Sequence, residues 1–136
     1  MTKKSYLPVY TLSEELINSI SHGVGTCLSI AALVLCIVQA AVNGTAAGVV
    51  SACIYGVSLT MLYIMSTLYH AITNRTARKV FRVFDHTSIF FLIAGTYTPI
   101  TLVTLGGALG WTLFGIVWAA AIVGIVLNAV SIEKFK

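Results

Sequence analysis

The sequence predicts an all-α membrane protein, a polytopic bundle of transmembrane helices, and three observations indicate this class. Of the 136 residues, 58% are hydrophobic and only 9% are charged, with a mean hydropathy of +0.96. A soluble domain typically carries about 25% charged residues. The apolar residues form four blocks, each close to the ~20 residues that a helix needs to cross a bilayer. Nearly all charged residues lie between or outside these blocks.

The four predicted spans follow one another closely within a single integral-membrane domain, residues 1–136. They cover approximately residues 17–42, 46–72, 84–105 and 111–132. The first block is longer than the ~7–15 apolar residues of a cleavable signal peptide, and no small-residue cleavage site follows it. Before this block, Ser13 precedes two glutamates. This pattern predicts a helix start there, because a hydroxyl can cap a helix and acids favour its first turn.

Small residues in two of the spans predict close helix packing. In the second span, Gly48, Ala52 and Gly56 recur at every fourth position and form a smooth face for a neighbouring helix. Ala120 and Gly124 form a shorter face of this kind in the fourth span. Tight packing is a sufficient explanation for both patterns.

Pro99 lies inside the third span. It removes a backbone donor and deprives the Gly95 carbonyl of its usual partner. Thr96, Thr98 and Thr101 surround the proline and could supply compensating hydroxyl groups. We therefore expect a kink in this helix.

The basic residues are expected on one side of the membrane. They lie before the first span, between the second and third, and after the fourth, whereas the connections at 43–45 and 106–110 have none. Because cytoplasmic loops are rich in Lys and Arg, we expect both ends of the chain and a basic loop at 73–82 to be cytoplasmic, in a multi-pass protein of the plasma or inner membrane. The residues concerned are Lys3, Lys4, Arg75, Arg78, Lys79, Arg82, Lys134 and Lys136.

The net charge of +4 does not indicate a nucleic-acid partner, since the charge lies in a loop between membrane spans. Membrane lipids are the expected partners instead. The basic loop is expected to face anionic head groups. The residues that would contact them are Arg75, Arg78, Lys79 and Arg82.

Two islands of ionisable residues interrupt the apolar sequence. Such residues are costly in hydrocarbon unless they have a partner or a function. One island is 66–70, near the end of the second span, and the other begins with Asp85 and His86 at the start of the third. Alternating span directions place both islands, and the start of the first span, at one depth. The expected polar layer contains Glu15, Asn18, His22, Ser66, His70, Asp85 and His86.

The chemistry of this layer leaves two interpretations open. A neutral imidazole is a common zinc ligand, and a carboxylate can bind a metal or act as a general base. In the simpler interpretation, Asp85 caps the third span beside neighbouring arginines, and His70 hydrogen-bonds to an adjacent span. Spacing alone does not separate the two.

The polar layer belongs to three longer motifs. They are Glu15-x-x-Asn18-x-x-x-His22-Gly23, Ser66-Thr67-Leu68-Tyr69-His70, and Asp85-His86-x-x-Ile89-Phe90-x-x-Ile93-Ala94-Gly95-Thr96-Tyr97-Thr98-Pro99. Together they resemble the hemolysin III family, the bacterial branch of the progestin and adipoQ receptor group, which is related to membrane hydrolases that include alkaline ceramidases. The motif from Asp to Pro is specific, and the resemblance covers nearly the whole chain.

The resemblance implies a zinc site. In that family the histidine of the Ser-x-x-x-His motif is a zinc ligand, a role that falls on His70. The aspartate of the third span and the serine of the second lie around the metal-bound water, and these roles fall on Asp85 and Ser66. The resemblance also implies seven spans, the last of which supplies the other two zinc ligands from an His-x-x-x-His motif.

This sequence departs from the family in having four predicted spans and no histidine after His86. We therefore expect either a fragment or truncated product, or a site that a second chain completes, as in a homo-oligomer. His22 and His86 could in principle substitute for the other ligands, but neither matches the family's ligand pattern.

Three functions remain open. The first is a zinc-dependent membrane hydrolase that cleaves an amide or ester of a lipid such as a ceramide-like molecule, although this chain alone would not be active. The second is pore formation or cytolysis, as the family's name implies, and four apolar spans without a polar stripe do not specifically support it. The third is a non-catalytic regulator of membrane fluidity or lipid composition.

Overall fold

The computed structural model describes residues 10–134, with side chains described as far as Val130. The chain forms four long α-helices, and a π-helix continues the third. All four helices are long and apolar enough to cross a membrane, and residues 10–134 contain no strand. The all-α class with four spans is confirmed. The elements are α1 (Leu12–Asn43), α2 (Ala46–Ala71), α3 (Arg75–Pro99), η1 (Ile100–Leu105) and α4 (Gly107–Lys134).

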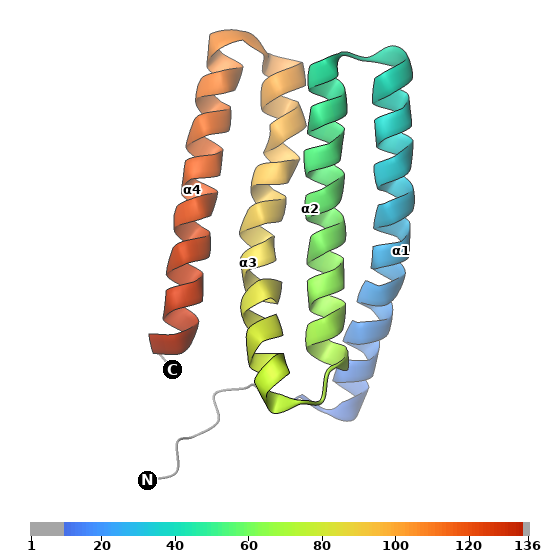
Figure 1. Cartoon of the computed structure of the whole chain (residues 1–136), viewed down its shortest axis with the longest axis vertical. Helices are drawn as coiled ribbons and strands as arrows, with labels where there is room; N and C mark the ends of the chain where they lie inside the picture. The colour runs from blue at the N-terminus through green and yellow to red at the C-terminus, as the bar shows by residue number, and fades with distance from the viewer. Residues whose placement is uncertain (1–9, 135–136) are drawn as a thin grey trace.

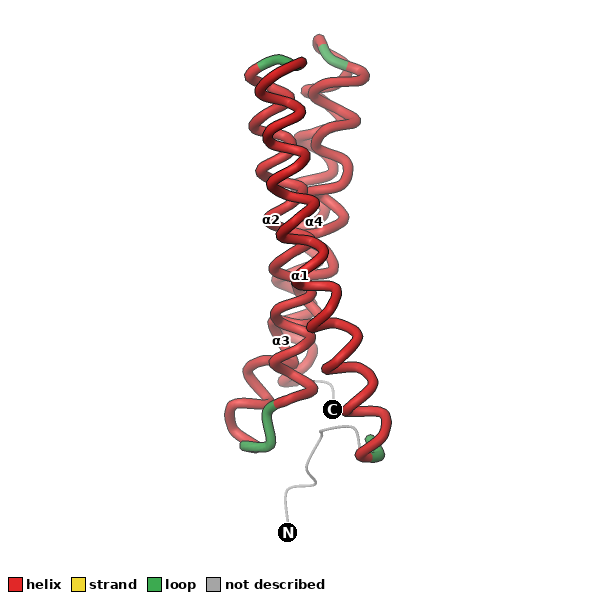
Figure 2. The backbone as a smooth tube through the Cα atoms, turned by 90° about the vertical axis from the view of Figure 1, so that its right-hand side faces the viewer, coloured by secondary structure: helices red, strands yellow, loops and turns green. Residues whose placement is uncertain are grey.

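The helices stand side by side in a single layer. Each packs against its neighbours in the chain, so α1 and α4 form opposite edges and α2 separates α1 from α3 (Figure 1). After a turn of 90° the helices overlap in a narrow column (Figure 2). The start of α1, the α2–α3 connection and the end of α4 lie at one end of the layer. We call this the basic end, because residues 75–82 lie there, and the other the distal end.

Thr11, two residues before the expected Ser13, caps α1. The Thr11 hydroxyl accepts a hydrogen bond from the Glu14 amide at 3.3 Å, and the Glu14 carboxylate accepts one from the Thr11 amide at 2.7 Å. This reciprocal pair is a capping box, which requires the glutamate three residues after the cap. The predicted helix start and the acidic residues in its first turn are confirmed, but the capping hydroxyl belongs to Thr11 rather than to Ser13, because the capping box needs the glutamate three residues after the cap.

The segment expected as a basic loop at 73–82 is mostly helical. Only residues 72–74 connect α2 to α3, and residues 75–82 form the first two turns of α3. The Asn74 side chain caps this helix by accepting hydrogen bonds from the amides of Thr76 and Ala77 at 3.0 and 3.1 Å. A local cap therefore extends the helix beyond its apolar block, which hydropathy could not reveal.

Small residues bring α1, α2 and α3 close together. A Cβ atom on Gly56 of α2 would lie 2.4 Å from the Leu33 side chain of α1. One on Gly95 of α3 would lie 2.1 Å from the Ser58 hydroxyl oxygen of α2. Small interfaces of this kind are typical in lipid, where large apolar side chains gain little by leaving the membrane. The expected packing role of Gly56 is confirmed.

Contacts between α3 and α4 are more aromatic. A Cβ atom on Gly124 would lie 2.5 Å from the Phe90 ring, so close packing there agrees with the sequence pattern. Ala120, expected on the same face, is exposed instead. A hydrogen bond also joins the helices, because Trp118 Nε1 donates to Thr98 Oγ1 at 3.1 Å.

Pro99 changes the type of helix. After it, η1 runs to Gly106, whose amide donates to the Thr101 carbonyl at 3.0 Å, and whose φ of 59° lies in the left-handed region that glycine favours. The Thr101 hydroxyl donates to the carbonyls of Tyr97 and Thr98 at 2.9 and 3.1 Å. Threonine hydroxyls thus hydrogen-bond to backbone carbonyls around the proline, but those of Thr96, Thr98 and Thr101 go to Leu92, Ala94, Tyr97 and Thr98 rather than to the Gly95 carbonyl.

Candidate functional site

The expected polar layer lies at the basic end, on three adjacent helices. Because these helices run antiparallel, the starts of α1 and α3 meet the end of α2 at one depth (Figure 1). We call this group the polar cluster. Its members are Glu15, Asn18 and His22 of α1, Ser66 and His70 of α2, and Asp85 and His86 of α3.

Glu15 connects all three helices. Its Oε2 atom lies 2.7 Å from His70 Nδ1 of α2, and its Oε1 atom forms an ion pair with Arg78 of α3. The side chains of His70, Glu15 and Arg78 are only 8%, 14% and 18% exposed. The Arg78 guanidinium also stands over the Tyr69 ring, 5.2 Å from its centroid. Pairing with a partner of opposite charge is what makes such burial of a carboxylate acceptable.

A second series of contacts runs from α1 to α3 through Ser66, which is buried. His22 Nδ1 lies 2.6 Å from Ser66 Oγ. Asp85 of α3, whose side chain lies 3.4 Å from His86 Nδ1, is close enough to Ser66 and His70 to interact electrostatically with both. The Ser66 hydroxyl therefore bonds to an imidazole of α1 and lies near a carboxylate of α3.

Aromatic rings that had no assigned role surround His70. Tyr69 is buried, and its ring centroid lies 4.8 Å from that of His70. Tyr10, just before α1, places its ring edge against the same imidazole at 5.5 Å. For Tyr69 the available signal was its place between Ser66 and His70 in one motif. Tyr10 lies outside the three motifs, and its contact depends on the path of the chain into α1.

The basic residues of α3 divide into two faces. Arg75 and Lys79 are exposed, whereas Arg82 is buried and Arg78 is half-buried against Glu15. The two members of each pair are four residues apart, so they lie one turn apart on the same side of the helix. Of the four basic residues, only Arg75 and Lys79 are therefore exposed on the surface of the helix layer. The other predicted basic residues, Lys3, Lys4, Lys134 and Lys136, lie outside the residues whose side chains are described.

One histidine of the described residues has the surroundings that a metal ligand would need. Among residues 10–130, no group of three His, Cys, Asp or Glu side chains is arranged to hold a metal ion. His70 fits one position of a site, because Glu15 occupies Nδ1 and leaves Nε2 as the nitrogen that can bind a metal. A carboxylate behind the imidazole is the usual support for a metal-binding histidine.

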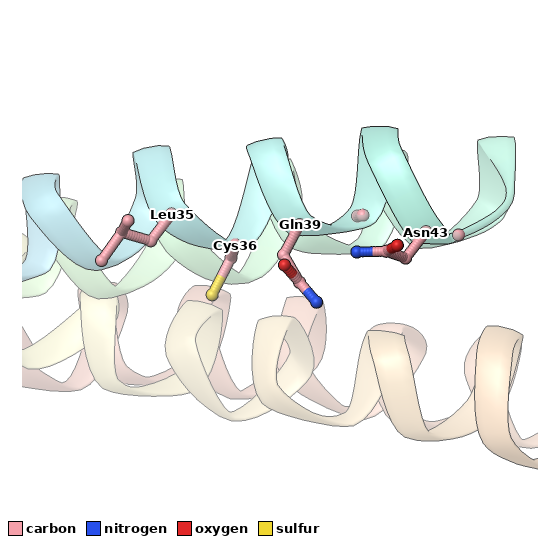
Figure 3. Close-up of a pocket in the computed structure, with 6 residues that line it drawn as sticks. Leu35, Cys36, Gln39 and Asn43 are labelled. Carbon is pink, nitrogen blue, oxygen red and sulfur yellow. The ribbon is translucent and has the colours of Figure 1, made fainter.

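Two cavities lie at the distal end, away from the polar cluster. The larger, about 640 Å³, is lined by the end of α1 and by Gly44 just after it (Figure 3). The second, about 310 Å³, lies between α1, α2, α3 and η1, and Cys36 lines both. No acidic, basic or histidine side chain lines either cavity, so we do not assign the site to them. The larger is lined by Leu35, Cys36, Gln39, Ala40, Asn43 and Gly44, and the smaller by Cys36, Gly48, Ala52, Tyr55, Pro99, Val103 and Thr104.

Known proteins resemble this chain over almost its whole length. The family model described as "Haemolysin-III related" matches residues 10–136. "Hemolysin-3" of Bacillus cereus is 46% identical over 135 residues, which are 99% of this chain and 62% of the relative. "Hemolysin-3 homolog" of Bacillus subtilis (strain 168) is 46% identical over 127 residues, which are 93% of this chain and 60% of the relative.

A human protein is a more distant relative. The human "Monocyte to macrophage differentiation factor" is 30% identical over 92 residues, which are 64% of this chain and 39% of that protein. The chain thus spans about three fifths of the length of the two bacterial relatives. No solved structure matches it.

Proposed function

The chain belongs to the haemolysin-III-related family, and on this premise we propose that its polar cluster is part of a zinc-dependent membrane hydrolase site for lipid amides or esters. The observation that carries the proposal is the meeting of His70, Ser66 and Asp85 at one end of three apolar helices. Amide and ester bonds of lipids lie near the head groups, at the edge of the ~30 Å hydrocarbon core. The depth of the cluster therefore suits such a substrate.

Three residues of the cluster, His70, Asp85 and Ser66, have distinct roles in this proposal. His70 would bind zinc through Nε2, with ligands from outside the described residues completing the site, as the family resemblance implies. A bound zinc ion supplies a Lewis acid that polarises a carbonyl and lowers the pKa of water. Asp85 would accept a proton from the attacking water and return it to the leaving amine or alcohol. Ser66, which lies near Asp85, would hydrogen-bond to the carboxylate and keep it in place.

The same proposal includes an orientation in the cell membrane. We expect the basic end to face the cytoplasm, because basic segments are retained on that side. Arg75 and Lys79, the exposed pair, would contact anionic head groups and hold the helix end at the membrane surface. Such contacts are worth roughly 1 kcal/mol per basic residue near an anionic surface.

Zinc content tests the metal part of the proposal. In protein isolated from its native membrane, we expect about one zinc ion per chain. His70→Ala should lose the metal. His86→Ala is the matched control, since it removes an imidazole from the same cluster whose side chain is 40% exposed, and it should retain zinc. Well-folded protein without zinc would overturn the proposal.

Asp85→Asn separates hydrolysis from the alternatives. A hydrolase should keep its zinc and release fatty acid from a ceramide-like substrate about 10²–10⁴-fold more slowly, because the general base is lost. A non-catalytic regulator of lipid composition would keep its cellular effect in this variant. Cytolysis, which the names of the bacterial relatives suggest, would instead release dye from liposomes, and Asp85→Asn would leave the release unchanged.

A further inference from the structure

Glu15 is the one acidic residue of α1 that faces the polar cluster. Its neighbour Glu14 is exposed and completes the capping box with Thr11. That cap fixes where the helix begins, and one further residue along the helix turns the next carboxylate by about 100°. Glu15 therefore reaches α2 and α3, whereas Glu14 serves only the end of its own helix.

Both oxygen atoms of the Glu15 carboxylate are occupied. Oε2 lies 2.7 Å from His70 Nδ1, and Oε1 pairs with Arg78. An arginine partner keeps the carboxylate ionised, and an ionised carboxylate can only accept hydrogen bonds. The Nδ1 atom of His70 must therefore be the donor, and in a neutral imidazole the lone pair is then on Nε2.

The rings around His70 restrict its other orientations. Tyr10 and Tyr69 contact the imidazole at centroid distances of 5.5 and 4.8 Å. Arg78 also stacks over the Tyr69 ring, so the same arginine contacts both the Glu15 carboxylate and one of the two rings beside His70. A ring flip of His70 would keep the plane of the ring between these neighbours but would place a carbon atom opposite the carboxylate and lose the hydrogen bond.

We propose that Glu15, held by Arg78, is a positioning residue that fixes His70 in the Nδ1–H tautomer and presents its Nε2 atom to a metal. The metal part of this inference rests on the function proposed above, whereas the tautomer does not. The pair also explains why α1 belongs to the site, although α2 separates its backbone from that of α3. Neither residue is a catalytic residue, because both act through His70.

The tautomer can be measured in the metal-free protein. With ¹⁵N-labelled histidine near pH 8, above the ordinary imidazole pKa of about 6.5, the nitrogen shifts of His70 show which nitrogen carries the proton. We expect Nδ1–H in the wild-type protein and Nε2–H, or a mixture, in Glu15→Leu. Glu14→Gln is the matched control and should leave the His70 signals unchanged. An Nε2–H tautomer in the wild-type protein would overturn the inference, even if Glu15→Leu fails to fold.

Metal affinity is a separate readout that tells the two proposals apart. If both hold, Glu15→Leu should bind Zn²⁺ about 10–100-fold more weakly, the usual cost of losing a supporting carboxylate. Glu14→Gln should bind as the wild-type protein does. Nδ1–H in a protein that binds no zinc would contradict only the proposed function. Zinc binding to a protein whose His70 is Nε2–H would contradict only the positioning role.

Discussion

The basic end and the distal end of the layer use polar side chains in different ways. Towards the distal end, hydroxyls mostly return to their own helix: Thr96 donates to the Leu92 carbonyl at 2.8 Å, and Thr112 makes the same bond within α4. At the basic end, hydroxyls such as that of Thr67 also return to their own helix, but acidic and histidine side chains bond between helices, as Glu15 does with His70 at 2.7 Å. A hydroxyl that donates to a carbonyl of its own helix has its hydrogen bond supplied locally, so it gives no indication of a functional site. A polar bond that crosses between membrane helices identifies the region worth testing for function.

Packing is common to both ends, and the largest effect on stability is expected there. Gly95→Ala would place a Cβ atom 2.1 Å from the Ser58 hydroxyl oxygen and 3.4 Å from the Ile54 carbonyl oxygen. We expect a loss of about 1–3 kcal/mol in the free energy of unfolding, as for other overpacked interiors. Gly115→Ala is the control, since nothing lies within 4 Å of its added Cβ, and its effect should stay within about 0.5 kcal/mol.

Thermal and detergent-induced unfolding, followed by circular dichroism in micelles, would measure both glycine variants. Equal stability of the two would show that α2 and α3 do not pack as closely as described. The two ends could then no longer be compared as parts of one closely packed layer.

Ser66 and Thr67 are adjacent on α2 but bond in different directions. Ser66 bonds to His22 of α1 at 2.6 Å, whereas Thr67 donates to the Tyr63 carbonyl of its own helix at 2.7 Å. Ser66→Ala should therefore cost about 0.6–1.7 kcal/mol, the range for hydrogen bonds between membrane helices. Thr67→Val should cost less, because helix carbonyls already have backbone partners. The same unfolding assay measures both variants. A larger loss of unfolding free energy for Thr67→Val than for Ser66→Ala would contradict the view that bonds between helices contribute more than bonds within one helix.

Thr98 is an exception towards the distal end, and its removal should have the smallest of the three effects. It donates to the Ala94 carbonyl but also accepts from Trp118 of α4 at 3.1 Å. Thr98→Val should cost about 0.6 kcal/mol and move the indole N–H proton resonance of Trp118 upfield, because the hydrogen bond is lost. Thr96→Val, which breaks only a bond within α3, is the control and should leave that resonance in place.

Most of the fold could be predicted from the sequence, because hydropathy reports directly on membrane spans. The four spans, their alternation and the small-residue contact at Gly56 follow from composition and helical spacing. The ends of the helices were harder to predict from the sequence. The capping box at Thr11 and the Asn74 cap are local hydrogen bonds, and they extend α1 and α3 beyond their apolar blocks.

From the sequence we could predict the depth at which the residues of the candidate site lie, but not which of them contact one another. Alternating spans place His70 and Asp85 at one level whatever their side chains do. Which side chains pair depends on how each helix is rotated about its own axis. Arg78 has a fixed direction in α3 only because residues 75–82 are helical and do not form a loop. This is why Arg78, expected to face lipid, is paired with Glu15 instead.

The account depends most on the contact between Glu15 and His70, because of the two bonds that join α1 to α2 in the polar cluster this one reaches the proposed metal ligand. A double-mutant cycle of Glu15→Leu and His70→Leu, measured by unfolding in micelles, tests it directly. We predict a coupling energy of at least about 0.6 kcal/mol. The cycle of Glu14→Leu with His70→Leu should be additive within about 0.3–0.5 kcal/mol. Additivity in both cycles would contradict the account.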